Sequence, residues 1–122
     1  MIGGTGIDII EIYRIKNAVM KNNNFIYKIF TQREIDYFRS RNLLSEVVAG
    51  NFAAKEAIAK ALGTGFRKFS LKDIEILRDE LGAPVAFLHG GAKELVKEPY
   101  KLHVSISHSR ENAIAYAVLE VY

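Results

Sequence analysis

The chain has 122 residues, of which 49% are hydrophobic and 25% charged, and its net charge of +3 gives a pI of about 9.2. This balance predicts one soluble globular domain over residues 1–122, and the absence of cysteine excludes disulfides and thiolate metal sites. The basic residues are too dispersed to indicate nucleic acid, and no apolar run or signal segment indicates a membrane, so we expect a cytoplasmic protein that binds a polyanion or an acidic partner.

The N-terminal part is predicted to be a strand followed by short helices. Isoleucines mark a β-branched strand over residues 7–10, and helical spacing of apolar residues follows over residues 12–21. Residues 25–30 form an apolar turn or short helix. Thr31 and Glu34 then make a capping box, in which each residue's side chain accepts a hydrogen bond from the other's backbone amide.

An alanine-rich helix is the longest element that we expect. It is predicted to begin at Ser45, whose side chain can cap it, and to end near Leu62 with Gly63 as a left-handed stop. The segment 63–65 is Gly-Thr-Gly, but it lacks the spacing of a P-loop and follows a helix instead of preceding one.

The C-terminal part is predicted to be mainly antiparallel strands. Residues 74–78 and 85–88 form a hairpin, and a short helix over residues 90–97 follows it. Residues 102–107 and 112–121 form a second pair of strands. Because helices and antiparallel strands are segregated, the fold class is α+β, an antiparallel sheet with the long helix packed on it.

Asp8, Glu56 and Lys60 are the strongest candidates for chemistry. A carboxylate among isoleucines is costly unless it faces solvent, is paired or binds a metal, so the residue type alone leaves a solvent-facing Asp8 open. Glu56 and Lys60 alone are typical of a surface ion pair worth about 0.2–0.5 kcal/mol. However, small residues near the same helix face would let a ligand or another backbone approach: Ala49, Ala53 and Ala57. Two carboxylates from different elements could then share a magnesium ion.

Other polar residues have simpler interpretations. His108 ends a strand after two serines and competes with His103 for any role, and no G-x-S-x-G elbow supports a serine hydrolase. Arg14 and Lys21 are typical of a solvated helix face, although with Phe25 they could form a basic patch suited to an acidic helix.

Four segments occur together in the order and spacing of a known family: Gly6-Ile7-Asp8-Ile9, Phe52-Ala53-Ala54-Lys55-Glu56-Ala57, Lys60-Ala61-Leu62-Gly63-Thr64-Gly65 and Ser105-Ile106-Ser107-His108. Along essentially its whole length the chain resembles bacterial holo-acyl-carrier-protein synthases of the 4′-phosphopantetheinyl transferase superfamily. The resemblance implies transfer of 4′-phosphopantetheine from coenzyme A to a serine of apo-acyl carrier protein, with release of adenosine 3′,5′-bisphosphate, in fatty acid biosynthesis. It also implies a homotrimer with active sites between subunits.

The same resemblance implies roles for individual residues. Asp8 and Glu56 would hold Mg²⁺, and Lys60, Gly63 and Thr64 would lie near the coenzyme A phosphates. Pro84 would lie beside the adenine, and His108 and Ser109 would contact the 3′-phosphate end. Arg14 and Lys21, with Phe25, would meet the acidic helix of the carrier.

Two positions depart from some relatives, and one role stays open. Asn51 and Asn24 stand where some relatives carry basic residues, which puts a phosphate contact and a carrier contact in doubt. The sequence does not name the general base; a water held by the cation or Glu56 is preferred to His108. The main alternative is a non-catalytic nucleotide- or RNA-binding module, although the aromatic residues do not alternate with basic ones as a stacking platform requires.

Overall fold

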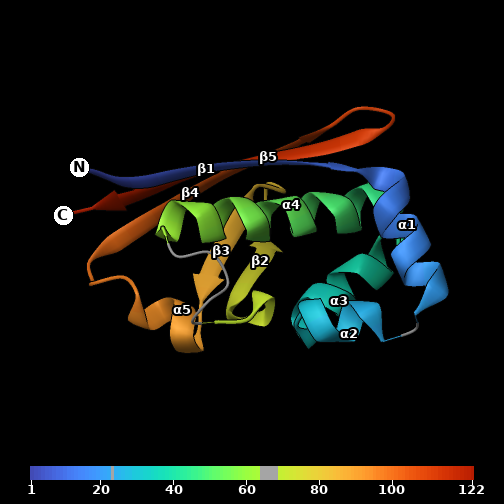
Figure 1. The fold of residues 1–122 in the computed structure, drawn as a ribbon, viewed down its shortest axis with the longest axis horizontal. Helices are drawn as coiled ribbons and strands as arrows, with labels where there is room; N and C mark the ends of the chain where they lie inside the picture. The colour runs from blue at the N-terminus through green and yellow to red at the C-terminus, as the bar shows by residue number, and fades with distance from the viewer. Residues whose placement is uncertain (23, 64–68) are drawn as a thin grey trace.

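The molecule has an α+β fold in which one long helix lies across a three-stranded antiparallel sheet, as expected (Figure 1). The computed structural model describes residues 1–22, 24–63 and 69–122. The elements in chain order are β1 (Ile2–Glu11), α1 (Ile12–Lys21), α2 (Phe25–Ile29), α3 (Gln32–Ser40), α4 (Ser45–Leu62), a 3₁₀ turn η1 (Leu71–Asp73), β2 (Ile74–Arg78), β3 (Pro84–Leu88), α5 (Gly90–Glu94), β4 (Tyr100–His108) and β5 (Asn112–Val121).

The large sheet has the strand order β1-β5-β4, and the small sheet pairs β2 with β3. In Figure 1 the large sheet lies above α4, while α1–α3 lie below one end of that helix and β2, β3 and α5 below the other. The face of α4 that carries small side chains packs on the large sheet. The alanines of α4 and β5 between them are buried: Ala53, Ala57, Ala113, Ala115 and Ala117. The main core therefore lies between α4 and the two sheets.

Two glycines of β1 allow an unusually close approach between that strand and α4. A Cβ atom added at Gly6 would lie 1.8 Å from the Ala57 carbonyl oxygen, and one at Gly4 would lie 2.0 Å from that of Ala61. Only glycine fits at such distances, since the obstacle is backbone and cannot rotate away. The alanine-rich helix thus admits another backbone, as the sequence predicted.

In β1, apolar side chains face solvent and an acidic side chain faces the helix, which is the reverse of the usual distribution. Ile7 and Ile9 point away from α4 and are 53% and 63% exposed, whereas Asp8 between them points toward the helix. Strand alternation requires this, because neighbours on a strand face opposite sides. Register confirms it: Asp8 lies opposite the buried Ala115, while Ile7 lies opposite the exposed Tyr116.

A second core joins α1, α2 and α3 to the N-terminal half of α4. Phe30 and Phe38 pack edge to face in it, with ring centroids 4.8 Å apart. The predicted capping box is confirmed: the Glu34 amide donates to the Thr31 hydroxyl, and the Thr31 amide donates to the Glu34 carboxylate at 2.9 Å.

Several boundaries differ from the prediction, and three of the differences have a clear local basis. Leu44 is the N-cap of α4 and Ser45 is the first residue inside the helix, so the expected Ser45 cap is wrong. The predicted 90–97 helix is shorter than expected: α5 ends at Glu94, and the Leu95 and Val96 amides donate to carbonyls three residues earlier, as in a 3₁₀ turn. β1 begins at Ile2 because pairing with β5 extends past its glycines. Within the described residues, no helix combines the length and apolar character that crossing a bilayer requires.

Candidate active site

Asp8 of β1 and Glu56 of α4 line one open cavity of about 410 Å³. The strand and the helix bring these residues together because Gly4 and Gly6 let β1 lie close against α4. Arg14 and Phe52 line the same cavity. The two carboxylates on which the predicted metal site depends therefore meet within a single chain.

Lys60 tethers α4 to β1 beside this cavity. Its ammonium group donates a 2.8 Å hydrogen bond to the Ile7 carbonyl oxygen and lies 3.4 Å from the Asp8 carboxylate. The Lys60 side chain is still 54% exposed, so it can also reach a ligand in solvent. The surface pair of Glu56 with Lys60 that the spacing suggested is thus replaced by a contact between Lys60 and Asp8.

The two carboxyl groups have raised pKa values. Burial raises the pKa of Asp8, and the hydrogen bond and charge of Lys60 offset only part of this effect. Burial also raises the pKa of Glu56, the negative charge of Asp8 raises it further, and Lys60 opposes both. A site with this electrostatic balance favours an additional positive charge, because a cation would lower the repulsion between the two carboxylates.

The donor set fits Mg²⁺. Asp8 and Glu56 would both offer hard carboxylate oxygens. Among residues 1–22, 24–63 and 69–122, no cluster of three or more acidic, histidine or cysteine side chains could enclose a metal ion. Mg²⁺ characteristically takes one or two protein carboxylates and fills its other positions with water and phosphate oxygens. A two-carboxylate cavity open to solvent matches that preference.

Gly63 lies one turn after Lys60, at the end of α4. It adopts the left-handed conformation (φ 87°), and its amide donates to the Lys60 carbonyl oxygen at 3.0 Å, so the predicted stop is confirmed. Thr64, the other residue predicted to lie near the phosphates, falls outside the described residues.

Three predicted ligand contacts do not reach the cavity of Asp8 and Glu56 within one chain. Pro84 begins β3 opposite Arg78, on the separate two-stranded sheet. His108 ends β4, and Ser109 closes the turn to β5, where its amide donates to the Asn112 carbonyl oxygen at 2.8 Å. The competitor His103 is paired with Glu120 at 2.9 Å.

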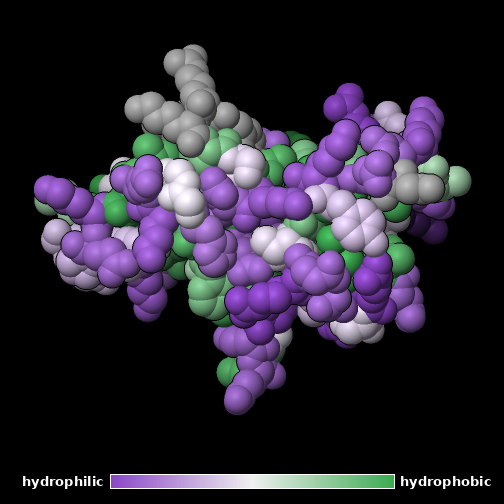
Figure 2. Space-filling model, turned by 90° about the horizontal axis from the view of Figure 1, so that it is seen from below, coloured by the Kyte–Doolittle hydropathy of each residue, from purple (hydrophilic) through white to green (hydrophobic). Residues whose placement is uncertain are grey.

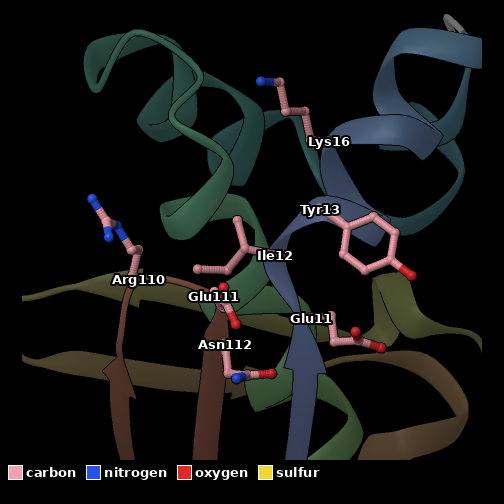
Figure 3. Close-up of a pocket in the computed structure, with 7 residues that line it drawn as sticks. All are labelled: Glu11, Ile12, Tyr13, Lys16, Arg110, Glu111 and Asn112. Carbon is pink, nitrogen blue, oxygen red and sulfur yellow. The ribbon is translucent and has the colours of Figure 1, made fainter.

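A second cavity, of about 450 Å³, adjoins the first where β1 meets α1 and β4 turns into β5 (Figure 3). Glu11 and Asn112 line both cavities. Figure 3 shows Lys16 on the helix and Arg110 on the turn at its margin. The hairpin that carries His108 and Ser109 therefore borders this neighbouring hollow.

The predicted basic patch is only partly assembled. Arg14 is exposed, lines the carboxylate cavity and pairs with Glu11 at 3.4 Å. Lys21 is exposed in the last turn of α1. Phe25 is half-buried against the second core, so it offers a partner only part of its ring.

Sequence reasoning missed two buried polar residues of α4. Lys55 and Asn51 are fully buried one turn apart and bond to β2, so Asn51 is a structural residue that does not line the cavity. The available signal was their i,i+4 spacing on a helix face that is otherwise small and apolar. The sequence also predicted Glu34 only as part of the capping box and did not predict its ion pair with Lys55.

The comparisons with known proteins agree with this geometry. A model of the 4′-phosphopantetheinyl transferase superfamily matches residues 4–118. A holo-[acyl-carrier-protein] synthase from Clostridium novyi is 61% identical, with 99% of this chain and 89% of the relative covered.

Solved structures give the same result. A holo-(acyl-carrier-protein) synthase from Bacillus anthracis, in complex with CoA (3′,5′-ADP), is 41% identical, has a TM-score of 0.84, and is aligned over 100% of this chain and 99% of its own. A holo-[acyl-carrier-protein] synthase from Neisseria meningitidis is 34% identical, with a TM-score of 0.90 and coverage of 99% and 100%. From these matches along its whole length, this chain belongs to the 4′-phosphopantetheinyl transferase superfamily.

Proposed function

We propose that this chain is a holo-[acyl-carrier-protein] synthase, which transfers 4′-phosphopantetheine from coenzyme A to a serine of apo-acyl carrier protein. The observation that carries the proposal is the meeting of Asp8 and Glu56 on one cavity, with Lys60 in contact with Asp8. The 61% identity to a synthase of that name supports it. We expect the reaction in the cytoplasm.

Asp8 and Glu56 are the proposed ligands of Mg²⁺. When bound, the cation would neutralise charge on the pyrophosphate of coenzyme A and stabilise the charge that develops as its bond breaks. The raised pKa values of both carboxyl groups support this assignment, because burial of both groups, together with the Asp8 charge acting on Glu56, makes the ionised pair costly without a cation.

Lys60 is the proposed contact for the phosphates, together with Gly63 and Thr64. The Lys60 ammonium group is held above β1 by its bond to Ile7 and remains half in solvent, so a phosphate can approach it without displacing a buried ion pair. Phosphoryl-type transfer requires positioning and charge neutralisation more than covalent chemistry from the protein.

In the proposed reaction the carrier serine oxygen forms a bond to the β-phosphorus of coenzyme A. The pyrophosphate P–O bond breaks, and adenosine 3′,5′-bisphosphate leaves with the bonding electron pair. Glu56, or a water beside it, accepts the serine proton.

We propose that the active enzyme is a homotrimer. On the outer face of the large sheet, which points away from α4, β1 and β5 carry an apolar patch defined by Ile7, Ile9, Ile114 and Tyr116, whose side chains are 36–63% exposed. An exposed apolar patch of neighbouring side chains often marks a protein contact. The opposite face of the molecule, seen in Figure 2, is mostly hydrophilic.

A trimer would also explain the scattered ligand residues. His108, Ser109 and Pro84 do not reach the cavity of their own chain. If the outer sheet faces pack together, the hairpin of one subunit can reach the cavity of the next. The proposed docking surface for the acidic carrier helix is Arg14 and Lys21, with a contribution from Phe25.

A mass-shift assay tests the reaction directly. The protein is incubated with coenzyme A, Mg²⁺ and apo-carrier, and we expect the carrier to gain one 4′-phosphopantetheine unit while adenosine 3′,5′-bisphosphate appears. A carrier whose acceptor serine is replaced by alanine is the control. Binding of coenzyme A without any mass gain would instead identify a non-catalytic nucleotide-binding module.

A further inference from the structure

The free edge of strand β2 is closed by three buried side chains instead of a third strand. On the side away from β3, Ile76 presents its amide and carbonyl groups, and Ile74 presents its carbonyl. The Glu34 carboxylate accepts a hydrogen bond from the backbone amide of Ile76 at 3.1 Å, and the side-chain amide of Asn51 donates one to the Ile76 carbonyl at 3.0 Å. We call Glu34, Asn51 and Lys55 the β2 clasp.

Lys55 is the centre of the β2 clasp. Its ammonium group donates to the Glu34 carboxylate at 2.7 Å, to the Leu71 carbonyl at 2.9 Å and to the Ile74 carbonyl. These bonds use all three of its donors, and both charged side chains of the pair are completely buried. The three bonds of the Lys55 ammonium group can form together only when α4 lies in one position relative to the three acceptors. The clasp therefore fixes α4 against α3, η1 and β2.

The β2 clasp and Lys60 hold α4 from opposite sides. Lys55 and Asn51 lie one turn apart on the face toward β2, whereas Lys60 bonds to Ile7 of β1. Glu56 directly follows Lys55 and points into the cavity beside β1. Successive helix residues differ by about 100° around the axis, so the rotation of α4 that satisfies the clasp also determines the direction of the Glu56 side chain.

We propose that the β2 clasp positions Glu56 for the divalent cation, so that Glu34, Asn51 and Lys55 act on metal binding without touching the metal. This inference rests on the proposed function, because it requires Asp8 and Glu56 to be the ligands. Partners that orient metal ligands commonly contribute 10–100-fold to metal affinity or activity.

The decisive variant is the double substitution Glu34→Gln with Lys55→Met. It removes both buried charges together, which avoids the uncompensated charge that either single change would leave. Mn²⁺ is titrated by calorimetry into wild-type and double-variant protein, each saturated with coenzyme A, and Asp8→Asn protein under the same conditions gives the background. We expect Mn²⁺ affinity to fall by about ten-fold, and the Mg²⁺ concentration for half-maximal activity to rise in parallel, with kcat largely restored at saturating Mg²⁺.

Two further variants separate positioning from loss of stability. Leu102→Ala removes packing against the main core on β4, a strand that carries no clasp residue and no clasp acceptor, and we expect it to lower the melting temperature without changing Mn²⁺ affinity. Asn51→Ser removes the side-chain bond to the Ile76 carbonyl and also the bond that the Asn51 side-chain oxygen accepts from Arg78 at 2.8 Å. It keeps the proposal testable if the double variant does not fold, and we expect about a three-fold loss of affinity.

The outcomes are distinct. Unchanged Mn²⁺ affinity in a folded clasp variant, or an equal loss in Leu102→Ala, overturns the positioning role and leaves the proposed function intact. Wild-type protein that binds no more Mn²⁺ than Asp8→Asn overturns the metal site itself, and the positioning role with it.

Discussion

Glu56 of α4 is oriented toward the same cavity as Asp8 of β1, and burial, followed by the charge on Asp8, raises the pKa of Glu56. Two residues far apart in the chain thus form one electrostatic unit. Without a cation, the ionised pair lowers the stability of the fold, and the first two predictions follow from this effect.

Removing one carboxylate should separate stability from activity. We expect Asp8→Asn or Glu56→Gln to melt at the same or a higher temperature than wild type in a metal-free buffer near neutral pH, because the ionised, partly buried pair is lost. Turnover should fall by at least about 100-fold, since a positioned metal contributes several kcal/mol. Thermal unfolding with a chelator and the carrier mass assay measure the two effects. Near-normal turnover of both variants at limiting Mg²⁺ would contradict the metal assignment.

The Mg²⁺ requirement should depend on pH at values above the usual carboxylate range. The folded-state pKa values of Asp8 and Glu56 are raised from 3.8 and 4.5, so protons compete with the metal as the pH falls toward these raised values. In the metal-free protein, the raised pKa values lower the free energy of unfolding at pH values above the folded-state pKa values, where both carboxyl groups are ionised. This loss of stability disappears below the unfolded-state pKa values. We expect the Mg²⁺ concentration for half-maximal activity to rise as the assay is moved from mildly alkaline to mildly acidic pH, because the raised pKa values make proton competition begin at a higher pH than ordinary carboxyl groups would. An unchanged requirement across that range would contradict the prediction.

The carrier-docking role of α1 predicts a selective effect on one substrate. Arg14→Ala combined with Lys21→Ala should raise the KM for carrier about ten-fold, since two exposed charge contacts contribute about 0.7 kcal/mol each, and should change the KM for coenzyme A much less. High salt should reduce the difference between wild type and variant. Lys93→Ala, an exposed lysine on α5, is the matched control. Equal effects on both substrates would exclude a docking helix.

Local sequence signals predicted most of the fold. The Thr31–Glu34 capping box and the Gly63 stop were correct because each depends on residues within one helical turn. Burial of Lys55 and Asn51 could not be predicted in the same way, since it depends on the free edge of β2, whose residues follow about 20 positions later. Asp8 is a second example. Strand alternation predicts that Asp8 and its isoleucine neighbours lie on opposite faces of β1, but it cannot predict that α4 covers the face that carries Asp8.

The close contact between β1 and α4 predicts a sharp difference between glycines. Gly6→Ala places a Cβ 1.8 Å from the Ala57 carbonyl oxygen, and we expect it to lower the free energy of unfolding by about 3 kcal/mol and to impair metal binding by separating Asp8 from Glu56. Gly3→Ala is the control, because its Cβ would meet the Val121 side chain, which can adjust, at 2.8 Å. We expect it to cost about 1 kcal/mol. Denaturant unfolding of both variants checks the difference, and similar losses would contradict the close-contact argument.

The trimer predicts that an aspartate on the outer sheet face abolishes activity without unfolding the chain. Tyr116 is 46% exposed in the single chain, opposite Ile7, so Tyr116→Asp should leave the subunit folded while burying an unpaired charge in any packed interface. We expect sedimentation to show monomers and turnover to fall by at least about 100-fold, because the cavity loses the neighbour's His108 and Ser109. Leu81→Asp is the control, since Leu81 is 95% exposed at the tip of the β2–β3 hairpin and away from this face. A wild-type protein that sediments as a fully active monomer would exclude the trimer, and the nucleotide contacts would then have to come from within one chain.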